Sequence, residues 1–449
     1  MFDKNQHLAL AEAIVHKAGT MGADLAEAYL LHSRELTVEV AAGEVETLKL
    51  AEDQGVGIRV FRQGRVGFAF SSSLSDSAIE QVIGEAVANS RMTEPDEYNC
   101  LPKGGFVYPE LAIYDPEIAR VSVESKVELA KEIERIAKAR DPRVKITETS
   151  AYSDSLYTVT IANSQGLKAA YQAANCGAYA FLVAEEQGDH QTGLGLQYGL
   201  HFSDLKPEAI GQEAADNAVR MLGAKTIPTQ KAAIVLDPRV STSFLGILAP
   251  SLSADAVQKG KSLLMGKVGT KVAADSLTVI DNGRLVGAVM SAPFDGEGVE
   301  TSETVLIRNG MLEGYLHNTY TAAKAGVKST GNGKRGTFKG TPEVGTTNFF
   351  IQPGQVSREQ LLKGVAKGLY ITEVMGMHTA NPISGDFSVG VAGLWIENGQ
   401  FLYPVRGVTV AGNLLEMLGR VENVADDLRF MGSKGSPTVQ IAEMMISGS

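Results

Sequence analysis

The fold of the N-terminal half is indicated most clearly by the stretch Gly55-Val-Gly-Ile-Arg-Val-Phe-Arg-Gln-Gly-Arg-Val-Gly-Phe-Ala-Phe70. Apolar residues alternate with polar residues or glycine on both sides of Gln63–Gly64, and such a pair favours a tight turn. The pattern therefore predicts two strands joined by a hairpin. The same alternation begins upstream, at Leu36 and Val38, so we expect residues 26–72 to be rich in strands.

Helical periodicity flanks these strands on both sides. Apolar residues recur at helical spacing from Leu8 to Ala18, and a second such run follows a capping residue at Ser75 or Asp76. The stretch 94–116 is rich in proline and glycine and shows no periodicity, so we interpret it as a linker.

The same order of elements recurs after the linker. We expect a helix over 123–139, strands over 157–161, 167–172, 177–183 and 194–202, and a helix over 207–222. Turns at Gln54–Gly55 and Gln165–Gly166 fall at comparable places in the two units. The sequence therefore predicts an internal duplication in which helix, strands and helix occur twice.

Beyond Pro228 the composition shifts to glycine, valine and threonine, with many short apolar runs and few helical pieces. This pattern predicts a β-rich C-terminal domain. The predicted fold class is α+β, with duplicated N-terminal helix–strands–helix units followed by that domain. The predicted boundaries are residues 1–95, 113–225 and 230–449.

Charge and cysteine content narrow the function. Lys plus Arg number 41 and Asp plus Glu 52, so the net charge is −11, which disfavours direct contact with nucleic acid. Two cysteines, Cys100 and Cys176, are too few for a disulfide framework, and we expect inert thiols. The first residues lack the apolar core of a secretion signal and no apolar run is long enough to span a bilayer, so we expect a cytoplasmic protein.

A nucleotide-binding pattern, G-x-G-x-x-G, occurs at Gly331, Gly333 and Gly336. The pattern should open a long helix, but Thr337-Phe-Lys-Gly-Thr-Pro342 follows and cannot start one. We therefore interpret the segment as a flexible loop.

Two histidines offer a possible metal site. His190 and His201 flank a predicted hairpin near several acids, and imidazole and carboxylate groups can together bind a metal. A solvated turn is the favoured interpretation, and a metal site is the alternative.

The richest polar segment between two apolar strands is Glu373-Val-Met-Gly-Met-His-Thr-Ala-Asn-Pro-Ile-Ser-Gly-Asp386. Loops of this composition often line functional sites. A polar turn punctuated by Asn381–Pro382 and Gly385 fits the same residues equally well.

Several longer stretches together resemble a known family. They include Leu312-Glu-Gly-Tyr-Leu-His-Asn-Thr-Tyr-Thr-Ala322, Ser329-Thr-Gly-Asn-Gly333 and Asn381-Pro-Ile-Ser-Gly-Asp-Phe-Ser388. Their order and spacing are similar to those of the PmbA/TldD family, once named modulators of DNA gyrase. The resemblance implies a two-lobed subunit that dimerises.

In the TldD branch of that family, one helix carries H-E-x-x-x-H, which with a distal cysteine holds zinc for peptide cleavage inside the dimer. The corresponding segment here is Ser243-Phe-Leu-Gly-Ile-Leu-Ala-Pro-Ser251, with Gly246 and Ser251 near the ligand positions and Ile247 near the base. The cysteine is also absent from its expected neighbourhood, Phe430-Met-Gly-Ser-Lys-Gly435. The loss of the whole set resembles the PmbA branch, often called TldE.

The resemblance thus implies an accessory subunit of a zinc peptidase that acts on unfolded or small peptides. It implies a heterodimer with a TldD-type chain, a possible homodimer, and an extended peptide as substrate. We expect no catalytic residue, metal ligand or cofactor in this chain, and zinc in the TldD-type partner. The candidate residues nearest to peptide or partner are Glu373, His378, Asn381 and Asp386.

Two alternatives stay open. The chain could be an independent hydrolase with a site around His378 or His190, which a clustered set of reactive side chains would reveal. It could also be a regulator associated with DNA gyrase, although the charge of −11 argues against direct DNA contact.

Overall fold

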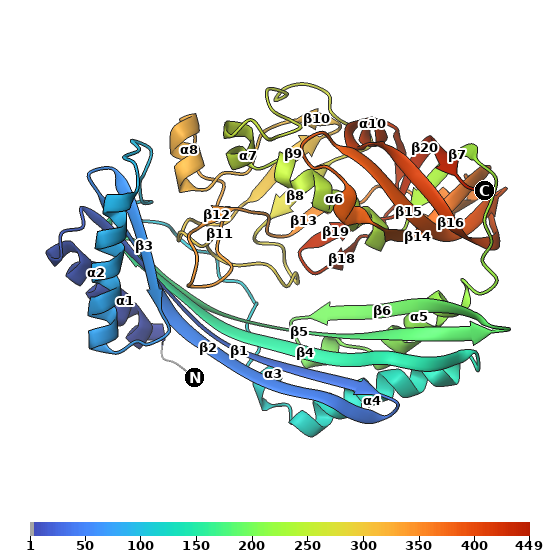
Figure 1. Ribbon diagram of the computed structural model, residues 1–449, viewed down its shortest axis with the longest axis horizontal. Coiled ribbons are helices and arrows are strands. Elements are labelled where there is room, and N and C mark those ends of the chain that lie inside the picture. The colour runs from blue at the N-terminus through green and yellow to red at the C-terminus, as the bar shows by residue number, and fades with distance from the viewer. Residues whose placement is uncertain (1–3) are drawn as a thin grey trace.

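A computed structural model describes residues 4–449 (Figure 1). Residues 1–3 of the predicted first unit lie outside the described residues. No helix within residues 4–449 is long and apolar enough to cross a membrane.

The N-terminal half forms one antiparallel sheet of six long strands in the order β3-β2-β1-β4-β5-β6. Its elements are α1 (Lys4–Thr20), β1 (Leu25–Ala41), β2 (Glu44–Arg62), β3 (Arg65–Ser71), α2 (Asp76–Asn89), α3 (Glu117–Arg120), α4 (Val123–Arg140), β4 (Val144–Asn163), β5 (Lys168–Glu186), β6 (Asp189–Gly199) and α5 (Pro207–Val219).

The predicted duplication is confirmed, because a helix, three strands and a helix occur twice in sequence order. The two units join through β1 and β4, which pair antiparallel at the centre of the sheet. The hairpins β2–β3 and β5–β6 turn at Gln63–Gly64 and Gln187–Gly188, and all four residues have positive φ. This conformation suits tight hairpins and confirms the predicted turn at Gln63–Gly64.

The turn predicted at Gln54–Gly55 is wrong, because Gly55 lies inside β2 opposite Leu31. A Cβ on Gly55 would lie 2.3 Å from the ring of Phe338, so glycine here permits a close approach of the C-terminal domain. The strands predicted over 167–172 and 177–183 are one strand, β5, because small buried residues between them, such as Ala173 and Ala174, continue the ladder.

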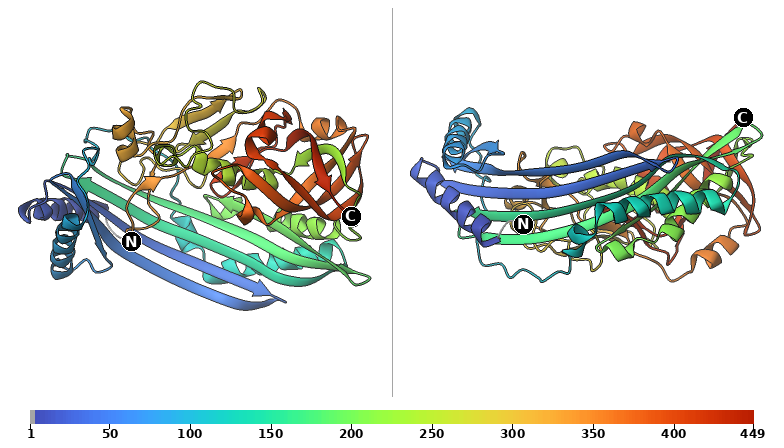
Figure 2. Two further views of the ribbon diagram at one scale, coloured as in Figure 1. Left: turned by 45° about the horizontal axis from the view of Figure 1, so that its top comes forward. Right: turned by 90° about the horizontal axis from the view of Figure 1, so that it is seen from below.

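The helices of both units cover the same face of the sheet (Figure 2). Alternate residues of β1 show why: Leu30 packs with α1 and α2, and Val38 packs with α4 and α5. Residues of the opposite parity, such as Tyr29 and Leu31, pack on the other face with Phe294 and Phe338 of the C-terminal domain. That domain lies over this face of the sheet (Figure 1).

The C-terminal region is β-rich, as predicted, and contains two six-stranded sheets. One has the order β16-β15-β14-β7-β20-β17, and a further β16–β20 pairing closes it on itself; the other has the order β10-β9-β8-β13-β19-β18. The first comprises β7 (Gln230–Leu236), β14 (Lys367–Met375), β15 (Asp386–Glu397), β16 (Gln400–Asn413), β17 (Val421–Val424) and β20 (Val439–Ser447). The second comprises β8 (Val279–Asn282), β9 (Glu303–Arg308), β10 (Met311–Leu312), β13 (Phe349–Ile351), β18 (Arg429–Met431) and β19 (Lys434–Ser436).

Five short helices and a two-stranded ribbon complete the domain. They are α6 (Pro238–Ser251), α7 (Ala254–Gln258), α8 (Thr319–Ala325), α9 (Arg358–Lys363), α10 (Leu414–Gly419), β11 (Gly333–Lys334) and β12 (Glu343–Val344). Both sheets and α6 contribute to one large apolar core, so α6 is fixed on several sides.

Candidate functional site

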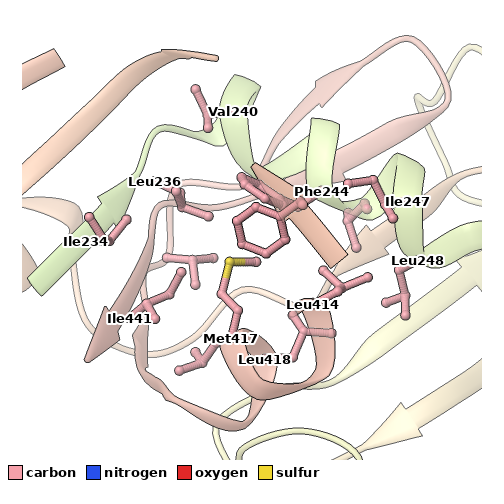
Figure 3. Close-up of a cluster of buried hydrophobic side chains, with 14 of the residues drawn as sticks. Ile234, Leu236, Val240, Phe244, Ile247, Leu248, Leu414, Met417, Leu418 and Ile441 are labelled. Atoms are coloured by element: carbon pink, nitrogen blue, oxygen red, sulfur yellow. The ribbon is translucent and has the colours of Figure 1, made fainter. Parts of the chain in front are cut away.

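Helix α6, on which the sequence places the missing metal motif, is a core helix. Asp237 caps it by accepting a hydrogen bond from the backbone of Arg239 at 3.1 Å, and Pro238 occupies the first turn. Phe244 and Leu248 pack among side chains of β7, β20 and α10 (Figure 3). The backbone is therefore held firmly where the motif would stand.

The predicted ligand positions carry no zinc-binding side chains. Gly246 has no side chain, and Ile247, which is 7% exposed, belongs to the apolar core. The Ser251 hydroxyl donates to the carbonyl of Pro382 at 3.1 Å. Zinc prefers thiolate, imidazole and carboxylate ligands, so this set does not fit the metal.

The segment expected to hold the distal cysteine does lie beside α6. A Cβ on Gly246 would lie 3.7 Å from Cε of Lys434, and the hydroxyl of Ser436 donates to that of Ser241 at 2.8 Å. The side chain nearest Gly246 therefore carries an ammonium group, which repels a metal ion. Within residues 4–449 no group of three or more His, Cys, Asp or Glu side chains is arranged to hold a metal.

Of the predicted loop residues, His378 and Asn381 lie in the connection between β14 and β15, while Glu373 lies near the end of β14 and Asp386 begins β15. Glu373, His378, Asn381 and Asp386 are all exposed, and no hydrogen bond described within residues 4–449 joins the side chains of any two of them. Asn381 accepts hydrogen bonds from the backbone of Ile383 and Ser384, at 2.9 and 3.3 Å. This arrangement is a local turn.

Asp386 accepts from the Asn413 amide at 2.9 Å, and this hydrogen bond, followed by one from Ser384, lowers the pKa of Asp386. The loop also receives the Ser251 hydroxyl on Pro382, at the end of α6. It therefore borders the helix on which the motif was expected.

The other two sequence candidates have different surroundings. His190 is the second residue of β6 and His201 follows the other end of that strand, so they lie roughly 30 Å apart at the usual strand rise and cannot share a metal. His201 lies 2.8 Å from Asp115, whose hydrogen bond raises the pKa of His201, and His190 lies 3.7 Å from Glu185. The metal alternative at these histidines is therefore wrong.

A pocket of about 450 Å³ opens between the uncovered face of the N-terminal sheet and loops of the C-terminal domain. Its volume lies in the range of small-ligand sites. The lining includes Tyr29, Tyr157 and Tyr171 on the sheet and Asp295, Asn332 and Arg335 on the loops. The pocket thus combines an aromatic wall with polar groups.

Four charged side chains, which we call the Glu27 cluster, lie buried beside this pocket: Glu27, Arg59, Glu297 and Arg335. Arg59 donates to Glu27 at 2.9 Å and to Glu297 at 3.1 Å. Arg335 forms an ion pair with Glu27 and donates to the carbonyl of Gly296 at 2.7 Å. Two cations and two anions therefore balance across the junction of the two halves.

Asp295 lies next to the Glu27 cluster, where it is 8% exposed and lines the pocket. Burial, together with the charge of Glu297, raises the pKa of Asp295 to about 8. Both carboxyl oxygens accept backbone hydrogen bonds, from Gly333 at 2.7 Å and from Glu297 at 2.8 Å. These bonds fix the carboxyl group in place.

No pattern in the sequence predicts this cluster, and the loop beside it differs from the flexible loop predicted there. Gly331, Gly333 and Arg335 belong to the segment predicted to be flexible, yet it is packed: Asn332 and Arg335 are buried. A Cβ on Gly331 would lie 2.4 Å from the carbonyl of Glu300. The glycines therefore permit close packing, and their spacing was the one feature of the sequence that could have indicated a packed loop.

Comparison with known sequences gives three consecutive family matches. Residues 26–90 match domain 1 of the PmbA/TldA metallopeptidases, residues 116–222 match their central domain, and residues 229–448 match their C-terminal domain. The Metalloprotease PmbA of Escherichia coli O157:H7 is 32% identical over 432 residues, covering 95% of this chain and 92% of the relative.

Solved structures share the whole fold. A Thermotoga maritima crystal structure, named for modulation of a DNA gyrase, has a TM-score of 0.91 and 31% identity, with 98% of this chain and 99% of that one covered. TldE from Thermococcus kodakarensis has a TM-score of 0.91 at 23% identity and covers 98% of this chain and 100% of its own.

Proposed function

The chain belongs to the PmbA/TldA metallopeptidase family, and from that premise we propose that it is an accessory subunit without catalytic activity of its own. In this proposal it works in the cytoplasm with a TldD-type subunit that holds the zinc. The pair cleaves unfolded or small peptides, and this chain helps to shape the chamber that receives them.

The observation that carries the proposal is the chemistry of α6. Gly246, Ile247 and Ser251 stand where the family motif would supply two ligands and a base. Lys434 lies beside the first of these positions and adds a positive charge. Restoring a metal site would need several simultaneous changes in a packed core. A shift of the alignment by a few residues does not supply the ligands either, because no histidine lies between His201 and His317.

The retained packing around α6 supports an accessory role. The helix still contacts β19 through Ser241 and Ser436 and the β14–β15 loop through Ser251 and Pro382. The second contact ties the loop of His378 and Asn381, flanked by Glu373 and Asp386, to the end of α6. We propose that this loop faces the partner or the peptide.

The pocket beneath the C-terminal loops supports a role in peptide binding. Its aromatic wall can contact apolar side chains of a peptide. An extended peptide is the substrate class that such a lining favours.

The experiment compares this chain, a TldD-type partner and the mixture of both. Each is assayed for cleavage of an unstructured peptide and for zinc by elemental analysis, and the mixture by size-exclusion chromatography. We expect neither cleavage nor stoichiometric zinc in the lone chain, and a heterodimer in the mixture. Full cleavage with stoichiometric zinc in the lone chain would overturn the proposal, and a lone chain that elutes as a homodimer would identify a second assembly.

One observation favours an independent hydrolase as the second candidate. Asp295, whose pKa is raised by burial, lines the pocket of about 450 Å³, and protonated carboxyls can act as general acids. Cleavage by the lone chain that survives metal chelation and disappears in D295N would favour this candidate. An indirect effect on DNA gyrase, through peptide degradation, is compatible with the accessory role.

A further inference from the structure

A second cavity lies where the other N-terminal unit meets the C-terminal domain. It measures about 520 Å³ and is bordered by β6 and α5 on one side and by the start of α6 and β18 on the other. Four arginines line it: Arg220, Arg239, Arg358 and Arg429. Neither the metal motif nor the peptide pocket involves these residues.

Three of the four arginines have acceptors within the protein. Arg429 grips Glu213 with both terminal nitrogens, one of them at 2.7 Å. Arg358 donates to the Tyr370 hydroxyl at 2.8 Å and lies 4.0 Å from Asp427. Arg239 donates to the carbonyl of Thr372 at 2.9 Å.

Arg220 is different. Its side chain makes no described hydrogen bond or ion pair with residues 4–449, and its Nε is buried without an acceptor. Nε of Arg358 is also buried and has no hydrogen bond. Buried guanidinium groups without acceptors are costly, so such atoms call for a missing partner.

The Glu27 cluster shows that a buried Nε alone does not define a site. Nε of Arg59 also lacks an acceptor, but the same guanidinium contacts two carboxylates. Arg220 has none. The distinguishing feature is a whole cationic side chain without an anionic partner.

The nearby carboxylates are already held by other donors. Asp237 accepts from Tyr370 at 2.5 Å and caps α6, Asp427 accepts from Thr438 at 2.7 Å, and Asp216 pairs with Arg140 at 2.9 Å. The charge of Asp216 is balanced by Arg140, which does not line the cavity. The four guanidinium groups of the lining therefore face three other carboxylates, those of Glu213, Asp237 and Asp427. The cavity therefore has one excess positive charge.

The electrostatics of Arg220 agree with this balance. Burial lowers the pKa of Arg220, and the attraction of Asp237 is opposed by the charges of Arg358 and Arg239. An added anion would offset both the cost of burying the Arg220 charge and its repulsion by Arg358 and Arg239.

We propose that this cavity binds a small oxyanion, a carboxylate or a phosphate group, and that Arg220 is its principal ligand with Arg358 beside it. A guanidinium group binds the two oxygens of either group through parallel hydrogen bonds, which explains the shared chemistry. The two sources are the free carboxyl end of a peptide and inorganic phosphate. The proposal does not depend on an accessory role for the chain.

Calorimetric titration of the full chain tests the site. Inorganic phosphate is one probe, and a short peptide with a free carboxyl end is the other, compared with the same peptide amidated. We expect saturable binding of at least one oxyanion, weakened about tenfold or more in R220M. The matched control is R308M, because Arg308 pairs with Glu313 on the surface, and its affinity should equal that of the wild type.

The three titrations distinguish a peptide carboxyl end from inorganic phosphate as the bound anion. Binding of phosphate alone assigns the site to phosphate, and binding of the free but not the amidated peptide assigns it to the carboxyl end. A thermal melt without ligand completes the test: R220M should be at least as stable as the wild type, because Arg220 has no partner to lose. Binding that R220M leaves unchanged, an absence of binding by both probes, or a large loss of stability in R220M would overturn the proposal.

Discussion

The N-terminal sheet meets the C-terminal domain at two junctions, one for each duplicated unit, and their charges differ. At the first, Glu27 and Arg59 on the sheet meet Glu297 and Arg335 on the other side, so two cations face two anions. At the second, around Arg220, the guanidinium groups outnumber the available carboxylates. The duplication provides two similar platforms, and only the second leaves a cation unpaired.

This difference separates two uses of buried charge. In the Glu27 cluster each ionised group is compensated by another, which suits a rigid connection between the two halves. In the Arg220 cavity the missing charge leaves room for a ligand. Substitutions at the first junction should therefore affect stability most, and substitutions at the second should affect binding.

The largest effect is expected from removing one anion of the Glu27 cluster. Glu27→Ala leaves Arg59 with one carboxylate and Arg335 with none, both buried. Uncompensated buried charge destabilises by about 3–5 kcal/mol, which denaturant unfolding monitored by circular dichroism measures. The control is Glu313→Ala, whose partner Arg308 is exposed, with an expected change below about 1 kcal/mol. Equal changes in the two variants would remove the distinction between the junctions.

Backbone packing at the first junction gives the next effect. A Cβ on Gly57 would lie 2.2 Å from the carbonyl oxygen of Phe338, so Gly57→Ala forces the sheet and the loop apart. We expect a loss of about 2 kcal/mol in the free energy of unfolding. Gly314→Ala is the matched control, because a Cβ there meets nothing within 4 Å. A Gly57 variant as stable as the control would mean that the junction is loose.

Local patterns in the sequence predicted the N-terminal half well, because its strands alternate regularly and its hairpins turn at residues such as Gln63–Gly64. They failed where tertiary contacts decide. Gly55 resembles a turn residue in the sequence, but it lies inside a strand, and the close approach of the Phe338 ring explains why this position is glycine. Strand β20 was not predicted, since a bulge between Ile441 and Met444 interrupts its alternation.

The sites show the same limit. The absence of a metal motif on α6 could be predicted, because it depends on residues within one short segment. The Glu27 cluster joins Glu27 to Arg335, 308 residues apart, and the Arg220 cavity joins α5 to α6 and β18. No local period carries such information, and each arginine alone resembles an ordinary surface residue.

The stability of the first junction should also depend on pH. The pKa of Asp295, raised by burial to about 8, lies above that of an unfolded carboxyl, so the folded state binds the extra proton. Stability should therefore fall as the pH rises towards 8, by at most about 1.4 kcal/mol per pH unit, and level off above it. Thermal unfolding of wild type and D295N between pH 5 and 9 measures the difference. Parallel curves for the two proteins would show that Asp295 does not titrate in this range.

The smallest change in stability is expected at the second junction, where Glu213 pairs with Arg429 in a half-exposed position. Glu213→Ala should cost only about 1 kcal/mol, because Arg429 keeps the carbonyl of Leu196 at 2.9 Å and remains partly solvated. The same substitution adds a second unpaired guanidinium to the Arg220 cavity, so phosphate affinity should rise severalfold in calorimetry. If the Arg220 cavity binds anions through its excess positive charge, Glu213→Ala should change stability little and tighten phosphate binding. Weaker binding would instead mean that Glu213 positions Arg429 for the anion and does not compete with the anion for it.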